Sequence, residues 1–360
     1  MNEIKKIGIL TSGGDCAGLN PVIRAVVHHA TGNYGWQVLG ISQATIGLMS
    51  TPPKVMHFAS DKVDHLLTMG GTVLGTTNKG DPFAFPMADG TIRDRSADII
   101  AGYYELELDA LIGIGGDGSL AILRNLAQQG NLNLVGIPKT IDNDVGATEI
   151  SIGFDTAVEI ATEALDRLHF TASSHNRVMI LEVMGRDAGH IALGAGIAGG
   201  ADIILIPEIP YKIEKVCQKI IQRQQMDKHF CLVIVSEAVV SSSGDQLTQM
   251  MVDNQIRLGG IGNHLAREII KYTEAETRVT VLGHIQRGGI PSATDRVLAS
   301  AFGVAAVDLI AEGKFDHMVA WQNNQIISVP IAEAIKTYRN VDPQSTLIKT
   351  ARGLGICLGD

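Results

Sequence analysis

An acidic loop, PKTIDND at residues 138–144, contains two carboxylates separated by one amide residue. Of the pair Asp142 and Asp144, one can accept a proton from an attacking hydroxyl while the other supports it or a metal ion. Phosphoryl transfer requires an oriented nucleophile of this kind, because positioning and charge neutralisation supply the rest of the catalysis. The same composition is typical of an Asx-rich turn, and local composition alone favours that interpretation.

The glycine-rich segment TSGGD, residues 11–15, directly follows a short apolar run. Its adjacent glycines let the backbone approach a ligand, and the helix start that follows presents free N–H groups. Phosphate is the natural ligand for such a segment, and a simple tight turn is an equal alternative. The segment is not a Walker A loop, because no Gly-Lys-Ser/Thr sequence follows it.

A second glycine-rich segment, GIGGDGS at residues 113–119, places Asp117 at the end of a predicted strand. A carboxylate in that position can hold Mg²⁺ directly or through its waters. The alternative is a helix start in which Asp117 and Ser119 serve as local caps. The segment by itself favours nucleotide or diphosphate binding.

Several cations also stand close to predicted strands. Arg186, in the segment MGR at residues 184–186, can clamp a transferring phosphoryl group, although a surface charge is the commoner role of such an arginine. Four more cations stand near glycines, and their number suits a sugar phosphate better than a neutral sugar. They are Arg177, Arg278, His284 and Arg287. For any one of them alone, a scattered surface charge is the simpler interpretation.

The elements that must position these residues alternate along the chain as short apolar runs and longer amphipathic segments. We expect strands at residues 7–10, 110–114, 133–137, 178–183, 203–206, 231–235 and 279–282, and helices at 19–29, 119–128 and 154–171. This alternation predicts parallel sheets with helices on both faces and all carboxyl strand ends along one edge. Ligands of open α/β sheets bind outside those ends, where the polar segments fall. The serine-rich stretch 239–246 is predicted to be a surface loop.

The composition limits the class of protein. The 360 residues are 45% apolar and exceed the roughly 250–300 residues of a single core, so we expect two domains. The net charge of −9 argues against nucleic acid as a partner. The four cysteines form no CxxC pair, which disfavours a cysteine-based metal site or a disulfide framework and makes the cytoplasm the expected compartment. We expect no membrane contact, because no stretch approaches ~20 apolar residues.

Taken together, the segments resemble the phosphofructokinase family over nearly the whole chain. The matching segments are TSGGD at 11–15, GGT at 70–72, GGDGS at 115–119, PKTIDND at 138–144, GFDTA at 153–157, SSHNR at 173–177, EVMGR at 182–186, SE at 236–237 and ETRVTVLGHIQRGG at 276–289. Their order and spacing make a chance match negligible. Considered jointly, they outweigh the simpler interpretation of each segment alone.

The resemblance implies an α/β fold of two similar layered αβα domains with mainly parallel sheets and an active site in the cleft between them. Residues 1–153, with a return near 286–335, would bind the phosphoryl donor. Residues 154–285, with 336–360, would bind the sugar phosphate. The implied activity is that of a 6-phosphofructokinase of glycolysis, which transfers a phosphoryl group from ATP to the 1-hydroxyl of fructose 6-phosphate with Mg²⁺ as cofactor.

The resemblance also implies roles for individual residues in the donor and catalytic part. Asp142 would accept the proton of the sugar hydroxyl, Thr140 and Asp144 would position that hydroxyl and the metal, and Arg186 would stabilise the transferring group. Asp117 would hold Mg²⁺. The residues assigned to the donor are Gly13, Asn78, Lys79, Gly118, Ser119 and Lys139.

The sugar-phosphate part follows in the same way. Met184, Gly185 and Glu237 would line the sugar pocket, while His284 and Arg287 would hold the 6-phosphate. Arg177 and Arg278 match arginines that reach into the site of a neighbouring subunit in the family. A homotetramer, or at least a homodimer, is therefore expected.

The donor itself is left between two possibilities. Pyrophosphate users of the family carry Asp where this chain has Gly118, which leaves room for ATP. They also carry Lys where this chain has Lys139, which favours pyrophosphate. We give the steric argument more weight because a lysine does not exclude a nucleotide. Many ATP-dependent members have arginine in place of Asn78, and Met226 and His169 stand where an effector pocket would have arginines, so no effector response is predicted.

Two other classes of protein fit the sequence less well. A Rossmann dehydrogenase would need GxGxxG after the first strand, and residues 11–18 lack that spacing. A non-enzymatic regulator that binds sugar phosphates would have no need of the cluster formed by Asp117, Asp142 and Asp144.

Overall fold

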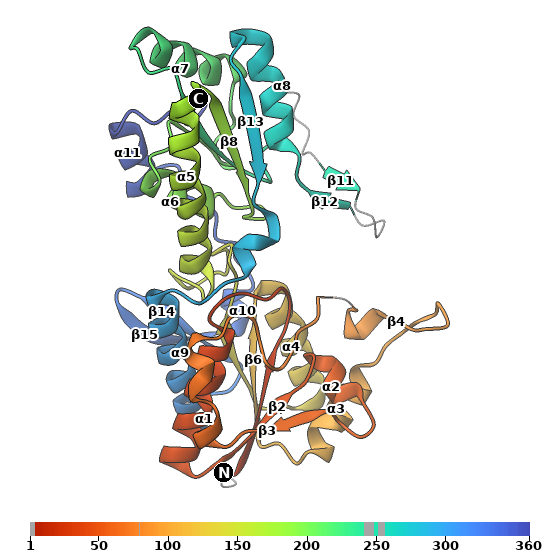
Figure 1. Ribbon diagram of the computed structural model, residues 1–360. Helices are drawn as coiled ribbons and strands as arrows, with labels where there is room; N and C mark the ends of the chain where they lie inside the picture. Colours follow the sequence, from red (N-terminus) through yellow and green to blue (C-terminus); the bar gives the residue numbers. More distant parts are fainter. Residues whose placement is uncertain (1–3, 79, 241–247, 251–255) are drawn as a thin grey trace. The chain divides into compact units, whose positions relative to one another are not determined.

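The computed structural model describes residues 4–78, 80–240, 248–250 and 256–360, and it divides into two compact units (Figure 1). Unit 1 comprises Met1–Thr140, Asp144–Thr156 and Arg287–Tyr338, and unit 2 comprises Ile141–Asn143, Ala157–Gln286 and Arg339–Asp360. Each unit has its own sheet and its own buried core, and each is described separately below.

Unit 1 is built on a seven-stranded sheet of order β15-β14-β7-β6-β1-β2-β3. The strands are β1 (Lys6–Thr11), β2 (Gln37–Ile41), β3 (Val55–His57), β6 (Ala110–Gly115), β7 (Leu134–Pro138), β14 (His317–Gln322) and β15 (Gln325–Pro330). Neighbours from β14 to β2 are parallel, while β3 and β15 are antiparallel edge strands. The central strands are buried on both faces, as apolar parallel strands are expected to be.

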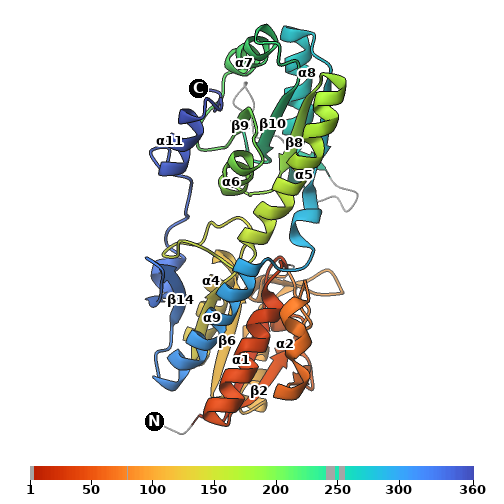
Figure 2. The same ribbon diagram turned by 60° about the vertical axis from the view of Figure 1, so that its left-hand side comes forward.

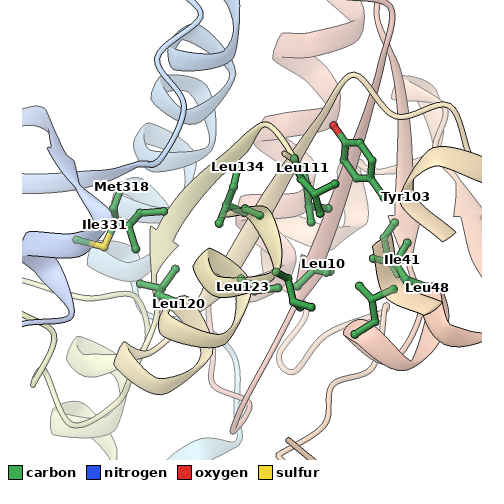
Figure 3. Packing of buried hydrophobic residues seen from close by; sticks show 14 of the residues in the cluster. Leu10, Ile41, Leu48, Tyr103, Leu111, Leu120, Leu123, Leu134, Met318 and Ile331 are labelled. Atoms are coloured by element: carbon green, nitrogen blue, oxygen red, sulfur yellow. The ribbon is translucent and has the colours of Figure 1, made fainter. Parts of the chain in front are cut away.

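Helices cover both faces of this sheet. On one face, α1 (Leu19–Tyr34) packs against α9 (Ala293–Ala311), which also contacts β7 and β14 (Figure 2). The other helices are α2 (Thr45–Met49), α3 (Ser96–Glu105), α4 (Asp117–Gly130) and α10 (Ile331–Ala334). Helix α3 packs against both α2 and α4, and α10 packs against α4. These helices bury the mainly aliphatic cluster shown in Figure 3. The remaining elements are the 3-10 helices η1 (Ser60–Lys62), η2 (Asp64–Thr68) and η3 (Pro82–Ala84) and the pair β4 (Phe85–Pro86) and β5 (Ile92–Arg93).

Unit 2 has a smaller, fully parallel sheet of four strands in the order β13-β8-β10-β9. Its strands are β8 (Val178–Val183), β9 (Ile203–Leu205), β10 (Cys231–Ser236) and β13 (Thr277–Val281). Its helices are α5 (Phe154–His175), α6 (His190–Ala198), α7 (Ile213–Gln225), α8 (Ile261–Thr273), η4 (Gly283–Arg287) and α11 (Thr346–Gly353), with β11 (Thr248–Met250) pairing antiparallel to β12 (Ile256–Leu258). The first residues of α5 belong to unit 1 and the last residue of η4 does too.

The expected α/β class with a mostly parallel sheet is confirmed, and every predicted strand and helix is present. The helices are longer than predicted: α1 continues to Tyr34, α4 begins at Asp117 and α5 continues to His175. The two antiparallel edge strands of unit 1 were not predicted. Of the predicted serine-rich loop, residues 241–246 lie outside the described part of the chain. Over the part that is described, none of the helices is both apolar enough and long enough to span a membrane.

Candidate active site

Three of the predicted motifs meet at the carboxyl ends of β1, β6 and β7 in unit 1. Lys139, which follows β7, donates its backbone N–H to the Gly115 carbonyl at 3.0 Å. Its ammonium Nζ donates to the carbonyl oxygen of Gly14 in the TSGGD loop. Lys139 is only 4% exposed, so this cation is held inside the group of loops rather than on the surface. Parallel strands bring these loops together although Gly14 and Lys139 are 125 residues apart in sequence.

The backbone of the TSGGD loop is fixed at Gly13. This residue has a φ of 82°, and a Cβ atom there would lie 2.9 Å from the Ser119 Oγ. Its N–H donates to the Thr77 carbonyl at 3.0 Å and its carbonyl accepts from the Thr76 hydroxyl at 2.7 Å. Only glycine fits this conformation and this close approach. Asn78 follows directly and is exposed, while Lys79 lies outside the described residues.

Asp117 is the first residue of α4, and the N-cap position is taken by Gly116. Asp117 therefore lies in the first turn of the helix, one residue after the N-cap. The next residue, Gly118, is exposed and faces open space, with no atom within 4 Å of a built Cβ. The start of α4 thus presents a carboxylate beside a helix N-terminus, where negatively charged groups are favoured.

Asp144 is a buried carboxylate of unit 1, with 1% of its surface exposed. Burial raises the pKa of Asp144, hydrogen bonding by Tyr338 and Thr140 opposes that rise, and the charge of Asp117 adds to it. The two carboxylates are therefore near enough to repel each other. A divalent cation between or beside the two carboxylates would offset this repulsion.

This pair suits Mg²⁺ better than a transition metal. Over the described ranges of the chain, no group of three or more His, Cys, Asp or Glu side chains is arranged to hold a metal ion. Mg²⁺ does not need such a group, because it keeps several waters and binds through one or two carboxylates together with substrate phosphates. The carboxylate oxygens of Asp117 and Asp144 are donors of the kind that such a site uses.

The second group of predicted residues lies at the carboxyl ends of β8 and β10 in unit 2. After β8 the chain turns sharply at Gly185, where a Cβ atom would lie 2.5 Å from the Ala188 carbonyl oxygen. Arg186 has a left-handed φ of 52°, and its N–H donates to Glu237 Oε1 at 3.2 Å. Such a backbone conformation is unusual for arginine and is typical of functional turns. The turn leaves the Arg186 side chain exposed.

Glu237 and Asp142 share this part of unit 2. Burial raises the pKa of Glu237 to about 7, the Arg186 N–H opposes the rise, and the charge of Asp142 adds to it. Asp142 is itself buried, and it lies two residues along the chain from both Thr140 and Asp144. The loop 138–144 therefore carries residues of both groups.

Two residues that support this turn were not singled out from the sequence. The buried carboxylate of Glu182 accepts the N–H groups of Gly260 at 2.9 Å and Gly262 at 2.8 Å, at the start of α8. Gln286 Oε1 accepts the Met184 N–H at 2.8 Å. Both lie inside motifs that the sequence analysis identified, EVMGR and ETRVTVLGHIQRGG, but only the folded structure shows that their side chains accept backbone N–H groups.

The four basic residues are not gathered in one place. Arg177 precedes β8 and Arg278 lies near the start of β13, so both stand at the opposite end of the sheet from Arg186. Both pair with Glu276, at 2.9 Å and 2.5 Å. Arg177 and Arg278 therefore stand at the starts of strands and not, like Arg186, at the end of one.

The other two cations lie on η4. His284 is exposed in unit 2. Arg287 belongs to unit 1, where its Nη1 donates to the Asp15 carbonyl at 3.1 Å and packs on Gly14. Arg287 therefore touches the TSGGD loop directly.

Comparison with known proteins agrees with this arrangement. A family model described as phosphofructokinase matches residues 6–310. The chain is 74% identical over 360 residues to "ATP-dependent 6-phosphofructokinase 1" of Synechocystis sp. and 69% identical over 360 residues to the protein of that name from Nostoc sp., with 100% of both chains covered each time. A crystal structure of Pichia pastoris phosphofructokinase in the T-state is 28% identical with a TM-score of 0.80, covering 99% of this chain and 37% of that one.

The fold and the gathered loops define an α/β kinase with glycine-rich loops and carboxylates at the carboxyl ends of parallel strands. The chain belongs to the phosphofructokinase family. This confirms the resemblance found in its motifs.

The raised pKa of Glu237 predicts a specific pH dependence of stability. Between the ordinary value of 4.5 and about 7 the folded state holds a proton that the unfolded state has lost, so this group makes the free energy of unfolding fall as pH rises. In Glu237→Gln the fall from about pH 5 to about pH 8 should be smaller by on the order of 2 kcal/mol. Urea unfolding at both pH values measures it.

The exposed variant Glu163→Gln serves as the control and should parallel the wild type at both pH values. A Glu237→Gln protein whose unfolding free energy changes with pH as the wild type's does would show that Glu237 ionises normally.

Proposed function

We propose that the protein is an ATP-dependent 6-phosphofructokinase that transfers the γ-phosphoryl group of ATP to the 1-hydroxyl of fructose 6-phosphate. The observation that carries the proposal is the loop 138–144, in which Asp142 stands between Lys139 and Asp144. Lys139 bonds that loop to TSGGD, and Asp117 acts electrostatically on Asp144. The relatives with 74% and 69% identity bear the name of this activity.

Each residue then has a definite task. The Asp142 carboxylate accepts the proton of the attacking hydroxyl, and Arg186 lies against the oxygens of the group in transfer. Asp117 would hold Mg²⁺, with Asp144 positioning it, and the metal would neutralise phosphate charge. Gly13 and Ser119 bring backbone and hydroxyl donors to the donor phosphates. Met184 and Glu237 contact the sugar, and His284 and Arg287 contact its 6-phosphate.

ATP is favoured over pyrophosphate by the surroundings of two residues. Gly118 opens onto free space at the start of α4, which suits the bulk of a nucleotide. The Lys139 ammonium bonds the carbonyl of Gly14, so this lysine has a role in holding the loop besides any role toward phosphate. Its presence is therefore not a specific mark of a pyrophosphate user.

Arg177 and Arg278 support a role for a second subunit. Their place at the far end of the unit 2 sheet from Arg186 takes them away from the sugar residues of their own chain. A homo-oligomer in which they complete a neighbouring site fits this position.

The function is tested by a coupled spectrophotometric assay with fructose 6-phosphate and Mg²⁺. ATP, ADP, other nucleoside triphosphates and pyrophosphate are supplied in parallel as donors. Turnover with ATP is expected. Turnover with pyrophosphate alone would refute the choice of donor, and no turnover with any donor would favour a regulator that binds sugar phosphates without acting on them.

The role of Asp142 is tested by Asp142→Ser. Loss of the base should lower kcat by roughly 10²–10⁴-fold with little change in the affinity for fructose 6-phosphate. Stopped assays at saturating substrates give kcat, and titration calorimetry gives the affinity. Asp89→Ser, a change at an exposed turn, should keep the wild-type kcat, and an Asp142→Ser enzyme within a few-fold of wild type would end the assignment.

The role of Gly118 is tested with a matched pair of variants. A Cβ atom at this position meets no other atom within 4 Å, so both proteins should fold. Gly118→Ala should retain ATP turnover within a few-fold and gain stability, because alanine favours a helix by up to about 1 kcal/mol over glycine. Gly118→Asp should lose ATP turnover at least roughly tenfold, through crowding and charge next to the nucleotide. Equal ATP kinetics in the two variants would contradict the steric argument.

A further inference from the structure

A buried carboxylate outside the predicted site joins the starts of two helices in unit 1. Asp295, in the first turn of α9, is 0% exposed. Its Oδ1 accepts the Gly153 N–H at 2.8 Å, and its Oδ2 accepts the Thr156 N–H at 2.9 Å and the Thr156 hydroxyl at 2.5 Å. Gly153 and Thr156 stand at the start of α5, so a side chain of α9 satisfies N–H groups of α5.

The start of α9 is held by α5 in return. The Ser292 N–H donates to Thr156 Oγ1 at 3.0 Å, and the Ser292 hydroxyl donates to Asp155 Oδ2 at 2.6 Å. Ser292 Oγ also accepts the N–H of Asp295 at 3.1 Å. In an ordinary capping box both bonds stay within one helix. Here the third residue of each helix caps the other helix, so neither start can move alone.

The chemistry of this network requires a carboxylate and a hydroxyl. Asp295 faces three donors and can only accept, and the Thr156 hydroxyl must donate to it, which leaves the Thr156 oxygen to accept from Ser292. An amide at position 295 would turn an N–H group toward an N–H group. A valine at position 156 would leave the buried Ser292 N–H without its acceptor.

The α5 end of the network supports two of the predicted loops. Ile152, next to Gly153, bonds the acidic loop on both sides: its N–H donates to the Pro138 carbonyl at 3.3 Å and its carbonyl accepts the Thr140 N–H at 3.2 Å. The same Ile152 carbonyl accepts from the Cys16 thiol at 3.5 Å, at the end of the TSGGD loop. The Cys16 side chain also packs on Gly153.

The α9 end of the network supports a third segment, residues 287–292, which precedes α9. Only four residues separate Ser292 from Arg287, whose Nη1 reaches the Asp15 carbonyl at 3.1 Å. Within those residues Gly289 packs on the backbone of Gly70. Fixing Ser292 therefore fixes where the chain with Arg287 returns against TSGGD.

We propose that Asp295, acting through Thr156 and Ser292, is a positioning residue for phosphoryl transfer that sets the acidic loop, the TSGGD loop and Arg287 relative to one another. The inference rests on the proposed function. A displacement of about 1 Å in such a site can lower the rate by roughly 10²-fold, so the network controls rate without touching a substrate.

Kinetics of four variants test the proposal. In Asp295→Asn and Thr156→Val, kcat/KM for fructose 6-phosphate should fall at least roughly tenfold, with a fall in kcat at saturating substrates. Thr156→Ser retains the hydroxyl and should restore kcat to within a few-fold of wild type. The control is Asp202→Asn, because Asp202 in unit 2 is also a largely buried carboxylate that accepts a backbone N–H and pairs with an arginine, Arg223. It should keep the wild-type kcat.

Thiol labelling supplies a readout that general destabilisation would not produce. Burial raises the pKa of Cys16 to about 12 and that of Cys231 well above its usual range, so both thiols should resist a maleimide. In Asp295→Asn the labelling of Cys16 should accelerate at least roughly tenfold while Cys231 stays protected. In Asp202→Asn, whose carboxylate adjoins Cys231, the pattern should be reversed. Peptide mass spectrometry assigns the labelled cysteine, well below the melting temperature of each variant.

The outcomes separate the two levels of the argument. Wild-type kcat/KM in Asp295→Asn, or equal acceleration of labelling at Cys16 and Cys231, overturns the positioning role. A wild-type enzyme without turnover on any donor overturns the proposed function instead. In that case the labelling pattern still decides whether Asp295 fixes the loops.

Discussion

A buried cation, Lys139, is the constraint on which the donor part of the site depends. A charge taken out of water must be compensated by close polar partners, and this lysine has the Gly14 carbonyl for its ammonium and the Gly115 carbonyl for its N–H. Those partners belong to the loops after β1 and β6. The ammonium bond to Gly14 and the backbone bond to Gly115 therefore hold the ends of three parallel strands together.

The buried carboxylates illustrate how surroundings assign different tasks to one chemical group. Glu182 and Asp295 each accept two backbone N–H groups near helix starts, where anions are favoured, and they fix backbone. Asp144 and Glu237 instead lie near a second carboxylate, Asp117 and Asp142 respectively, and burial together with this repulsion raises the pKa of each. The first pair fixes backbone, while the second pair is set apart by a neighbouring carboxylate whose repulsion a bound cation would offset.

The buried strands and the turns that follow them differ in backbone conformation. Strands β1, β6 and β7 of unit 1 and strands β8 and β10 of unit 2 are buried regular elements, and each is followed by a loop that carries predicted site residues. The special backbone conformations follow them, at Gly13, Asn143, Gly185 and Arg186. Strained turns of this kind persist only where the surrounding structure determines them, and the packed strands provide that support.

The sequence by itself determined the α/β class, the positions of the strands and helices, and the loops that carry Asp117, Asp142 and Arg186. These properties depend on local apolar periodicity, glycine placement and motif order, which are legible along the chain. Tertiary structure decided the rest. Arg177 and Arg278 read as members of one basic group, yet strand direction puts them at the far end of the sheet from Arg186. No local sequence pattern indicated a role for Asp295, because the backbone groups that it binds are about 140 residues away in sequence. The raised pKa of Glu237 likewise arises only from burial and neighbours that folding brings together.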